Sequence, residues 1–110
     1  MPEAFEQVDW QSWESGRERS VAHLCMTPRE LADRYGFVLN TGNDGFDDFE
    51  DVCLKLASGR QVFLLQYARN PHPGTMVFID EEDDARAALA ELSFAMRLGR
   101  AAFAWVDPSI

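Results

Sequence analysis

The stretch VCLKLASGRQVFLLQYA, residues 52–68, decides the fold of this chain because its pattern is typical of two strands joined by a tight turn. Residues 52–57 and 61–68 are rich in apolar, branched and aromatic side chains, and Ser58-Gly59 between them predicts a β-hairpin. The two faces of the second strand are both apolar, with Val62 and Leu64 on one and Phe63, Leu65 and Tyr67 on the other. We therefore expect residues 61–68 to form a central strand, covered on both faces.

Upstream of the hairpin, residues 20–26 (SVAHLCM) predict a strand that leads into a helix. In Thr27-Pro28-Arg29-Glu30, Thr27 takes the N-cap position and Glu30 reaches back to complete a capping box. The helix is expected to end at Gly36, because glycine tolerates the left-handed conformation of a C′ residue. Residues 37–39 can then pair as a short strand.

Residues 40–51 (NTGNDGFDDFED) are predicted to form a loop, because Thr41-Gly42 and Asp44-Gly45 are turn signals. Phe46 and Phe49 are three residues apart, so we expect both to turn inward on one helical turn while the carboxylates face water.

Beyond the hairpin, residues 75–79 predict a further strand. Asp80 is expected to cap a helix that runs to about Leu98 and stops at Gly99. The tail that follows carries Phe103, Trp105 and Val106, which are expected to fold back onto the core.

These elements run in the order β-α-β-β-β-β-α, which predicts one small α+β domain over residues 20–110. We expect an antiparallel sheet of about four or five strands, with the two main helices on one face. Residues 1–19 are expected to form an arm that bears Trp10 and Trp13, with a short helical turn capped by Asp9. The arm can lie across its own domain or dock on a partner.

Length and composition bound the class of protein. A chain of 110 residues with 46% apolar side chains fits one domain with its own core. The sequence has no apolar run near the ~20 residues of a membrane-spanning helix. Its first twenty residues lack the apolar stretch of a secretory signal, so we expect a cytoplasmic protein. Cys25 and Cys53 lie in apolar runs and are expected to be reduced thiols in the core.

The net charge of −9 comes from two blocks that contain no Lys or Arg. The first block supplies Asp44, Asp47, Asp48, Glu50 and Asp51, and the second supplies Asp80, Glu81, Glu82, Asp83 and Asp84. Phosphate binding needs clustered bases, and the bases here are scattered, so direct nucleic-acid binding is not expected. A basic protein is the expected partner.

The second block has a structural interpretation, because carboxylates in the first turn of a helix stabilise it by about 0.3–1 kcal/mol each. The first block lies in a loop, where it is either solvated surface or a recognition patch. It lacks the Asp-x-Asp-x-Asp-Gly register of a calcium loop, and no Cys/His metal spacing occurs, so we expect no metal and no cofactor. His23 is expected in the core or at an edge, His72 in an exposed loop, and no feature places His72 beside Cys53.

The segment TPRELADRYGF, residues 27–37, resembles the opening helix of helix-turn-helix proteins. That resemblance implies a DNA-reading helix immediately downstream. The segment in that place, residues 38–51, is interrupted by glycines, has no basic residue and is negatively charged. Phosphates would repel it, so we do not expect DNA binding.

We expect a non-enzymatic, acidic protein-binding module, similar in size and charge to immunity proteins, antitoxins and other inhibitors that neutralise a basic toxin or nucleic-acid-binding protein. The first block would pair with Lys or Arg of the partner, and Phe46 or Tyr67 would supply the buried anchor. The alternative is a homo-oligomeric regulatory or accessory subunit, such as a homodimer. Its candidate contact residues are Phe94 and Leu98 on the last helix with Trp10 and Trp13 of the arm. A third hypothesis is an enzyme whose site the sequence hides.

Overall fold

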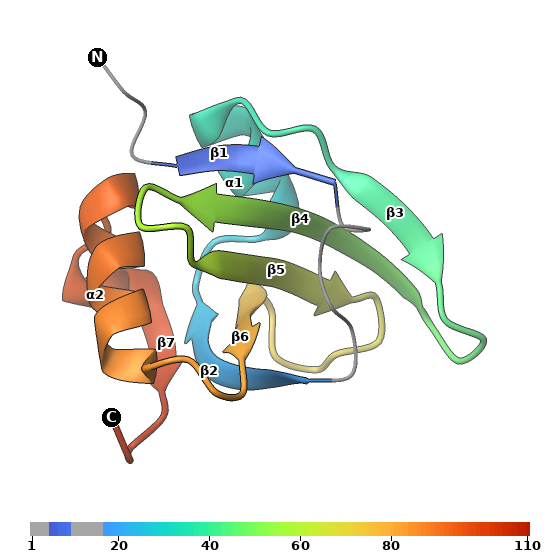
Figure 1. Cartoon of the computed structure of the whole chain (residues 1–110). Coiled ribbons are helices and arrows are strands. Elements are labelled where there is room, and N and C mark those ends of the chain that lie inside the picture. Colours follow the sequence, from blue (N-terminus) through green and yellow to red (C-terminus); the bar gives the residue numbers. More distant parts are fainter. Residues whose placement is uncertain (1–4, 10–16) are drawn as a thin grey trace.

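The computed structural model describes residues 5–9 and 17–110, and Figure 1 shows their arrangement. The described chain is a small compact domain with two α-helices and one antiparallel sheet, which confirms the α+β class. In chain order its elements are β1 (Phe5–Val8), β2 (Glu18–Leu24), α1 (Pro28–Tyr35), β3 (Asn40–Asn43), β4 (Asp48–Leu56), β5 (Gln61–Tyr67), β6 (Thr75–Asp80), α2 (Ala85–Met96), the 3-10 turn η2 (Arg100–Ala102) and β7 (Phe103–Val106).

The sheet has seven strands, with the path β1-β4-β5-β6-β2-β7 and β3 paired to β4 beside β1. β1 occupies residues 53–56 of the β4 edge, and β3 occupies residues 48–51. The predicted hairpin is confirmed as β4–β5, where the Leu56 N–H donates to the Arg60 carbonyl at 2.8 Å. β5 lies between β4 and β6, as its two apolar faces predicted.

The number of strands exceeds the expected four or five because three edge strands escaped prediction. β1, β3 and β7 have four residues each, too few for a readable alternation, and edge pairing depends on tertiary contact more than on propensity. The strand expected at residues 37–39 is wrong. The Gln7 side chain instead bonds both backbone groups of Val38, at 2.6 and 2.9 Å, and β3 starts only at Asn40.

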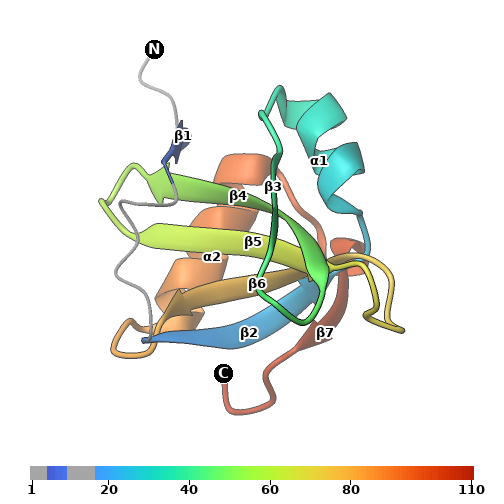
Figure 2. The ribbon, with the colours of Figure 1, turned by 90° about the vertical axis from the view of Figure 1, so that its right-hand side faces the viewer.

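One core lies between the sheet and the two helices. α1 contributes Leu31, and α2 contributes Ala85, Ala88, Leu89, Leu92 and Met96 to the same cluster of buried side chains from β2, β4, β5 and β6. Figure 2 shows α2 behind the sheet. The Tyr35 hydroxyl donates to the Met96 carbonyl at 2.5 Å and ties the end of one helix to the end of the other.

The ends of α1 follow the prediction. The Thr27 hydroxyl accepts the Glu30 N–H at 3.2 Å, the Glu30 carboxylate accepts the Thr27 N–H at 3.2 Å, and Gly36 adopts φ +75°. This capping box and left-handed C-cap fix the helix at both ends.

The expected limits of α2 are wrong at both ends. Asp80 still belongs to β6, opposite Glu18, so the helix starts later, with Asp84 as its cap and the Ala87 N–H 3.2 Å from the Asp84 carboxylate. It ends when Arg97 turns left-handed at φ 55°, two residues before Gly99.

The predicted arm contributes to the sheet where it is described. Phe5 packs against the core from β1, whereas Trp10, Trp13 and the expected helical turn lie outside the described residues. The tail folds back only in part: Phe103 packs on the core, but Trp105 and Val106 stay 46% and 41% exposed. Among the described residues, no helix has the length and apolar character needed to traverse a bilayer.

The two cysteines are both free thiols, but only one lies in the core. Cys53 is buried, as expected. Cys25 is exposed because it follows the last residue of β2, so its expected place in the core is wrong.

Candidate functional site

The first acidic block lies on a projecting hairpin, β3–β4, which extends beyond the helices at the right of Figure 1. We call residues 43–48 the hairpin tip. The last strand pair is Asn43 with Asp48, whose carboxylate accepts the Asn43 amide at 2.9 Å. The expected loop and helical turn over residues 40–51 are therefore wrong, since β3 and β4 pair through most of this stretch.

The carboxylates of the tip hold its backbone. Asp44 accepts the N–H groups of Phe46 at 2.9 Å and Asp47 at 3.1 Å, and these bonds hold the pKa of the Asp44 carboxyl below its usual range. Asp47 accepts the N–H of Asp48 at 2.8 Å and that of Arg69, in the loop after β5, at 2.8 Å. The turn is thus built from its own acidic side chains rather than from apolar contacts.

Phe46 stands at the end of this turn with 88% of its surface exposed. The expectation that it turns inward is wrong, because the Asp44 bonds and the left-handed Gly45, φ +95°, close a tight turn with no helical face. Phe46 is thus the most exposed large apolar side chain of the described residues.

Phe49 is buried further than Phe46 because it lies within the sheet. It faces Gly42 on β3 and Tyr67 on β5, and its ring meets the Tyr67 ring edge-on at 6.0 Å between centroids. Partial burial and the neighbouring Asp44 carboxylate raise the pKa of the Tyr67 hydroxyl. Tyr67, a predicted anchor, thus packs against Phe49 at the base of the tip.

The remaining acids of the first block do not join Phe46 on one surface. Glu50 pairs with Arg29 of α1 at 3.2 Å. Asp51 is only 3% exposed and accepts the Asn40 amide at 3.3 Å, and burial raises the pKa of its carboxyl. A partner at the tip would therefore meet Asp44 and Asp48, not Asp51.

A groove of about 620 Å³ runs beside the tip. Its polar lining includes Arg29, Thr41, Asp48, Glu50, Gln66 and Tyr67. Its volume is within the range of small-molecule sites, so the groove is the candidate place for the hidden enzymatic site and equally for a side chain of a protein partner.

The second acidic block forms the β6–α2 turn, and its acids contact other residues of the same chain. Its described contacts are the ion pairs Arg17–Glu81 (3.4 Å), Arg17–Glu82 and Arg60–Asp83 (3.4 Å), the Asp80 bond from the Glu82 N–H (2.9 Å) and the Asp84 helix cap. Only Asp84 sits at the helix start, as its N-cap, and the first turn of α2 contains no acid, so the expected place of the block in that turn is wrong. Asp80 belongs to β6, and Glu81, Glu82 and Asp83 pair with Arg17 and Arg60 instead.

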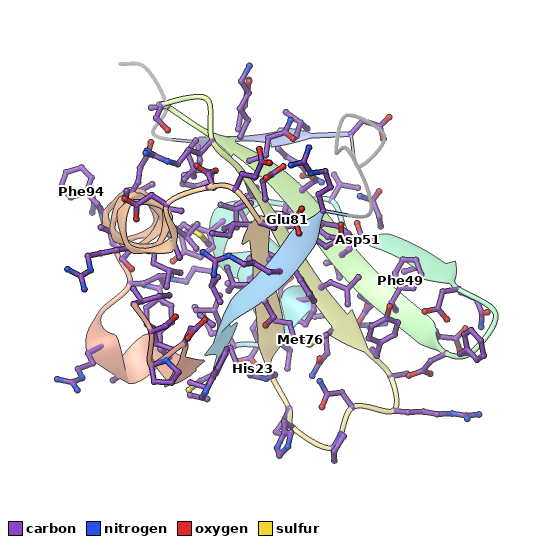
Figure 3. The ribbon with its side chains drawn as sticks, turned by 60° about the horizontal axis from the view of Figure 1, so that its bottom comes forward. His23, Phe49, Asp51, Met76, Glu81 and Phe94 are labelled. Carbon is purple, nitrogen blue, oxygen red and sulfur yellow. The ribbon has the colours of Figure 1, made fainter. Side chains whose placement is uncertain are left out.

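The residues predicted for self-association are not brought together. Phe94 projects from α2, as Figure 3 shows, and 85% of its surface is exposed. Leu98 packs in part against the core. Trp10 and Trp13 lie outside the described residues.

The structure assembles no Cys53–His72 pair. Cys53 is buried on β4, where burial and the nearby Asp51 and Asp9 raise the pKa of its thiol to about 11, far from that of a reactive thiolate. His72 is exposed in the β5–β6 loop, as expected, and lines a groove with Cys25 and His23. Within residues 5–9 and 17–110, no three His, Cys, Asp or Glu side chains are grouped to hold a metal.

Comparison with protein-family models, with curated proteins and with solved structures found no match. Function is therefore inferred from this chain's own residues. Sequence reasoning named Gly42 as a turn residue and expected Phe49 to face inward, but it missed that the two face each other across the β3–β4 pair. It also missed Arg29 and Arg69, which contact the acids of the hairpin. Every second residue of a strand lies on the same face, which puts Phe49, Asp51 and Cys53 together. This alternation was the signal in the sequence that β4 begins before residue 52.

Proposed function

We propose that this protein is a non-enzymatic binding module that docks on a basic protein through the hairpin tip. The observation that carries the proposal is the 88% exposure of Phe46 on a turn fixed by carboxylate–backbone hydrogen bonds. An aromatic side chain on a turn whose backbone is already fixed can enter a partner's pocket without the entropy cost of ordering that backbone, so more of its burial contributes to affinity.

The charge around Phe46 defines the partner. Asp44 and Asp48 are exposed beside it. Negative groups around an apolar anchor favour a pocket that is rimmed by Lys or Arg, and they speed the encounter of the two proteins more than they tighten the complex. The same charges oppose phosphate groups, so we propose a protein partner rather than nucleic acid.

Within this class, we propose an inhibitor of the immunity-protein or antitoxin kind, acting in the cytoplasm on a basic toxin or nucleic-acid-binding protein. Support comes from the small acidic domain, with its net charge of −9, and from a tip that reaches beyond the helices (Figure 1). A projecting rigid hairpin suits insertion into a cleft, such as the phosphate-binding cleft of a basic enzyme.

Quantitative affinity capture from the native organism tests the proposal. The wild type, Phe46→Ala and the control Phe94→Ala are immobilised and washed with rising salt; the control removes an equally exposed aromatic ring, 85% against 88%, from another face. We expect a basic protein to be retained by the wild type and by the control, to be lost from Phe46→Ala, and to elute as salt rises. Equal retention by Phe46→Ala would overturn the proposal.

One observation favours the alternative of a homo-oligomeric accessory subunit. Phe94 leaves a large ring uncovered on α2, and nearby Ala90 is also exposed. If this face associates, sedimentation should show an oligomer for the wild type and a monomer for Phe94→Asp. A monomer in both cases would remove this alternative.

A further inference from the structure

The groove beside the hairpin tip lies where the core face of the sheet runs out into solvent. Alternation along β4 places Asp48 and Glu50 on the same face as Val52, which belongs to the core under the helices. The hairpin continues beyond the helices, as Figure 1 shows. The two carboxylates therefore line the groove of about 620 Å³ at the point where the helices no longer cover this face.

The groove gathers hydrogen-bond acceptors from three strands. Thr41 on β3 and Gln66 on β5 both stand opposite Glu50, so all three side chains share one face of the sheet. Asp48 lies two residues from Glu50, or about 7 Å along the strand. A planar guanidinium, with five N–H donors in fixed directions, can contact both carboxylates at once, whereas an ammonium is a single point charge.

The chain already holds one guanidinium at this groove. Arg29, the second residue of α1, donates from Nε to the Glu50 carboxylate at 3.2 Å. Its side chain is 78% exposed, against 29% for Glu50, so Arg29 reaches the acid from the solvent side. Exposed ion pairs contribute little to stability, so another guanidinium can replace Arg29. The charged residues that line the groove are Arg29 and two acids, which leaves a net negative charge even with Arg29 in place.

We propose that this groove binds an arginine side chain of the basic partner, and that Arg29 takes the place of that arginine until the partner docks. The inference rests on the proposed function, since a partner that receives Phe46 brings its basic rim beside the groove. Asp48 belongs both to the tip and to the groove, so the two surfaces are continuous. The incoming guanidinium takes over Glu50 from Arg29 and reaches Asp48, and the displaced Arg29 side chain moves into solvent.

NMR titration of the isotope-labelled full chain at low salt tests the inference with a defined probe, N-acetyl-arginine amide. The matched ligands are N-acetyl-lysine amide and N-acetyl-citrulline amide, which has nearly the shape of the probe without its charge. Glu50→Gln and Asp48→Asn each remove one charge and keep an acceptor oxygen. Asp33→Asn, at an exposed position of α1, is the charge-matched control. The spectra also verify that each variant folds.

We expect the arginine probe to bind weakly and to shift the amide signals of the groove residues more than either matched ligand does. Glu50→Gln and Asp48→Asn should each weaken this binding by about fivefold or more, because each removes a charged acceptor. Asp33→Asn should leave it unchanged. Arg29→Ala should tighten it by about two- to fivefold, because the competing ion pair is lost.

Equal shifts from either matched ligand, or an Arg29→Ala variant that binds the probe no more tightly than the wild type, would overturn the inference. Phe46→Ala separates this result from the fate of the proposed function, because it should lose partner capture and still bind the probe. A wild type that captures its partner through Phe46 but ignores the probe contradicts the inference alone. Probe binding together with capture that does not need Phe46 contradicts the proposed function alone.

Discussion

Replacing Gly42 by alanine should disturb the hairpin that carries the tip. Gly42 faces Phe49 across the β3–β4 pair, and a Cβ atom at Gly42 would lie 2.6 Å from Cζ and 2.9 Å from Cε1 of the Phe49 ring. Such contacts are too short, so the ring must move. Movement costs its edge-on contact with the Tyr67 ring.

The expected loss of stability is moderate. Overpacking of a well-packed site costs about 1–3 kcal/mol. Alanine returns about 0.4–1 kcal/mol by restricting the unfolded chain, where its backbone conformation is tolerated. The net destabilisation relative to the wild type is therefore about 0–2.6 kcal/mol, whereas relative to a Gly→Ala control with the same gain and no clash it is about 1–3 kcal/mol. A change of 1 kcal/mol lowers the Tm of a small domain by roughly 4–8 °C, so we expect a Tm about 4 °C or more below that of the control.

Urea unfolding followed by circular dichroism measures this change. Gly99→Ala is the matched control, because Gly99 has φ −86° and a Cβ atom there would meet nothing within 4 Å. The control should unfold at the same urea concentration as the wild type, or at a slightly higher one. The reasoning is refuted if Gly42→Ala is folded and as stable as the control.

Three further predictions concern single side chains. The Asp44 carboxyl has a depressed pKa in the folded state, so its stabilising bonds are present above the pKa of the unfolded chain and are lost as pH falls through the folded pKa. The protection factor of the Phe46 N–H in hydrogen exchange should therefore fall only at pH values below the ordinary aspartate pKa. Burial raises the pKa of the Asp51 carboxyl, so its negative charge opposes folding at pH 7. Asp51→Asn should therefore raise the Tm at pH 7, and this gain should vanish in acid, where the carboxyl is protonated. The substitution should leave capture of the partner unchanged. Thr27→Ala breaks the capping box with Glu30 and should cost about 0.5–2 kcal/mol in urea unfolding.

Much of the fold could be predicted because its signals are local. The capping box at Thr27, the left-handed Gly36 and the turn at Ser58-Gly59 depend on neighbours within a few residues, and the structure confirms each. The limits of α2 could not be read in the same way. Asp80 pairs with Glu18, which is far away in the sequence. This pairing keeps Asp80 in β6, although the local sequence predicts that a helix starts there.

The candidate site was located by its charge, but its geometry was not predicted. Asp51 and Cys53 are two residues apart on β4, so their side chains lie on the same face of the sheet. That face is covered at this point, and Asp51 is therefore buried and not exposed to solvent. Phe46 was expected inside because Phe46 and Phe49, three residues apart, would share one face of a helical turn. Its exposure follows from the tight turn that the Asp44 hydrogen bonds close. The acids and glycines of this segment predict a turn, but they do not predict these particular bonds.

Site-specific photo-crosslinking from the hairpin tip tests the central claim most directly. Benzoylphenylalanine replaces Phe46 in one protein and Phe94 in the control, two positions with 88% and 85% exposure, and both are irradiated in cells of the native organism. The docking account predicts one crosslinked basic protein from position 46 and none of it from position 94. The same product from both positions, or no product from position 46, would contradict it.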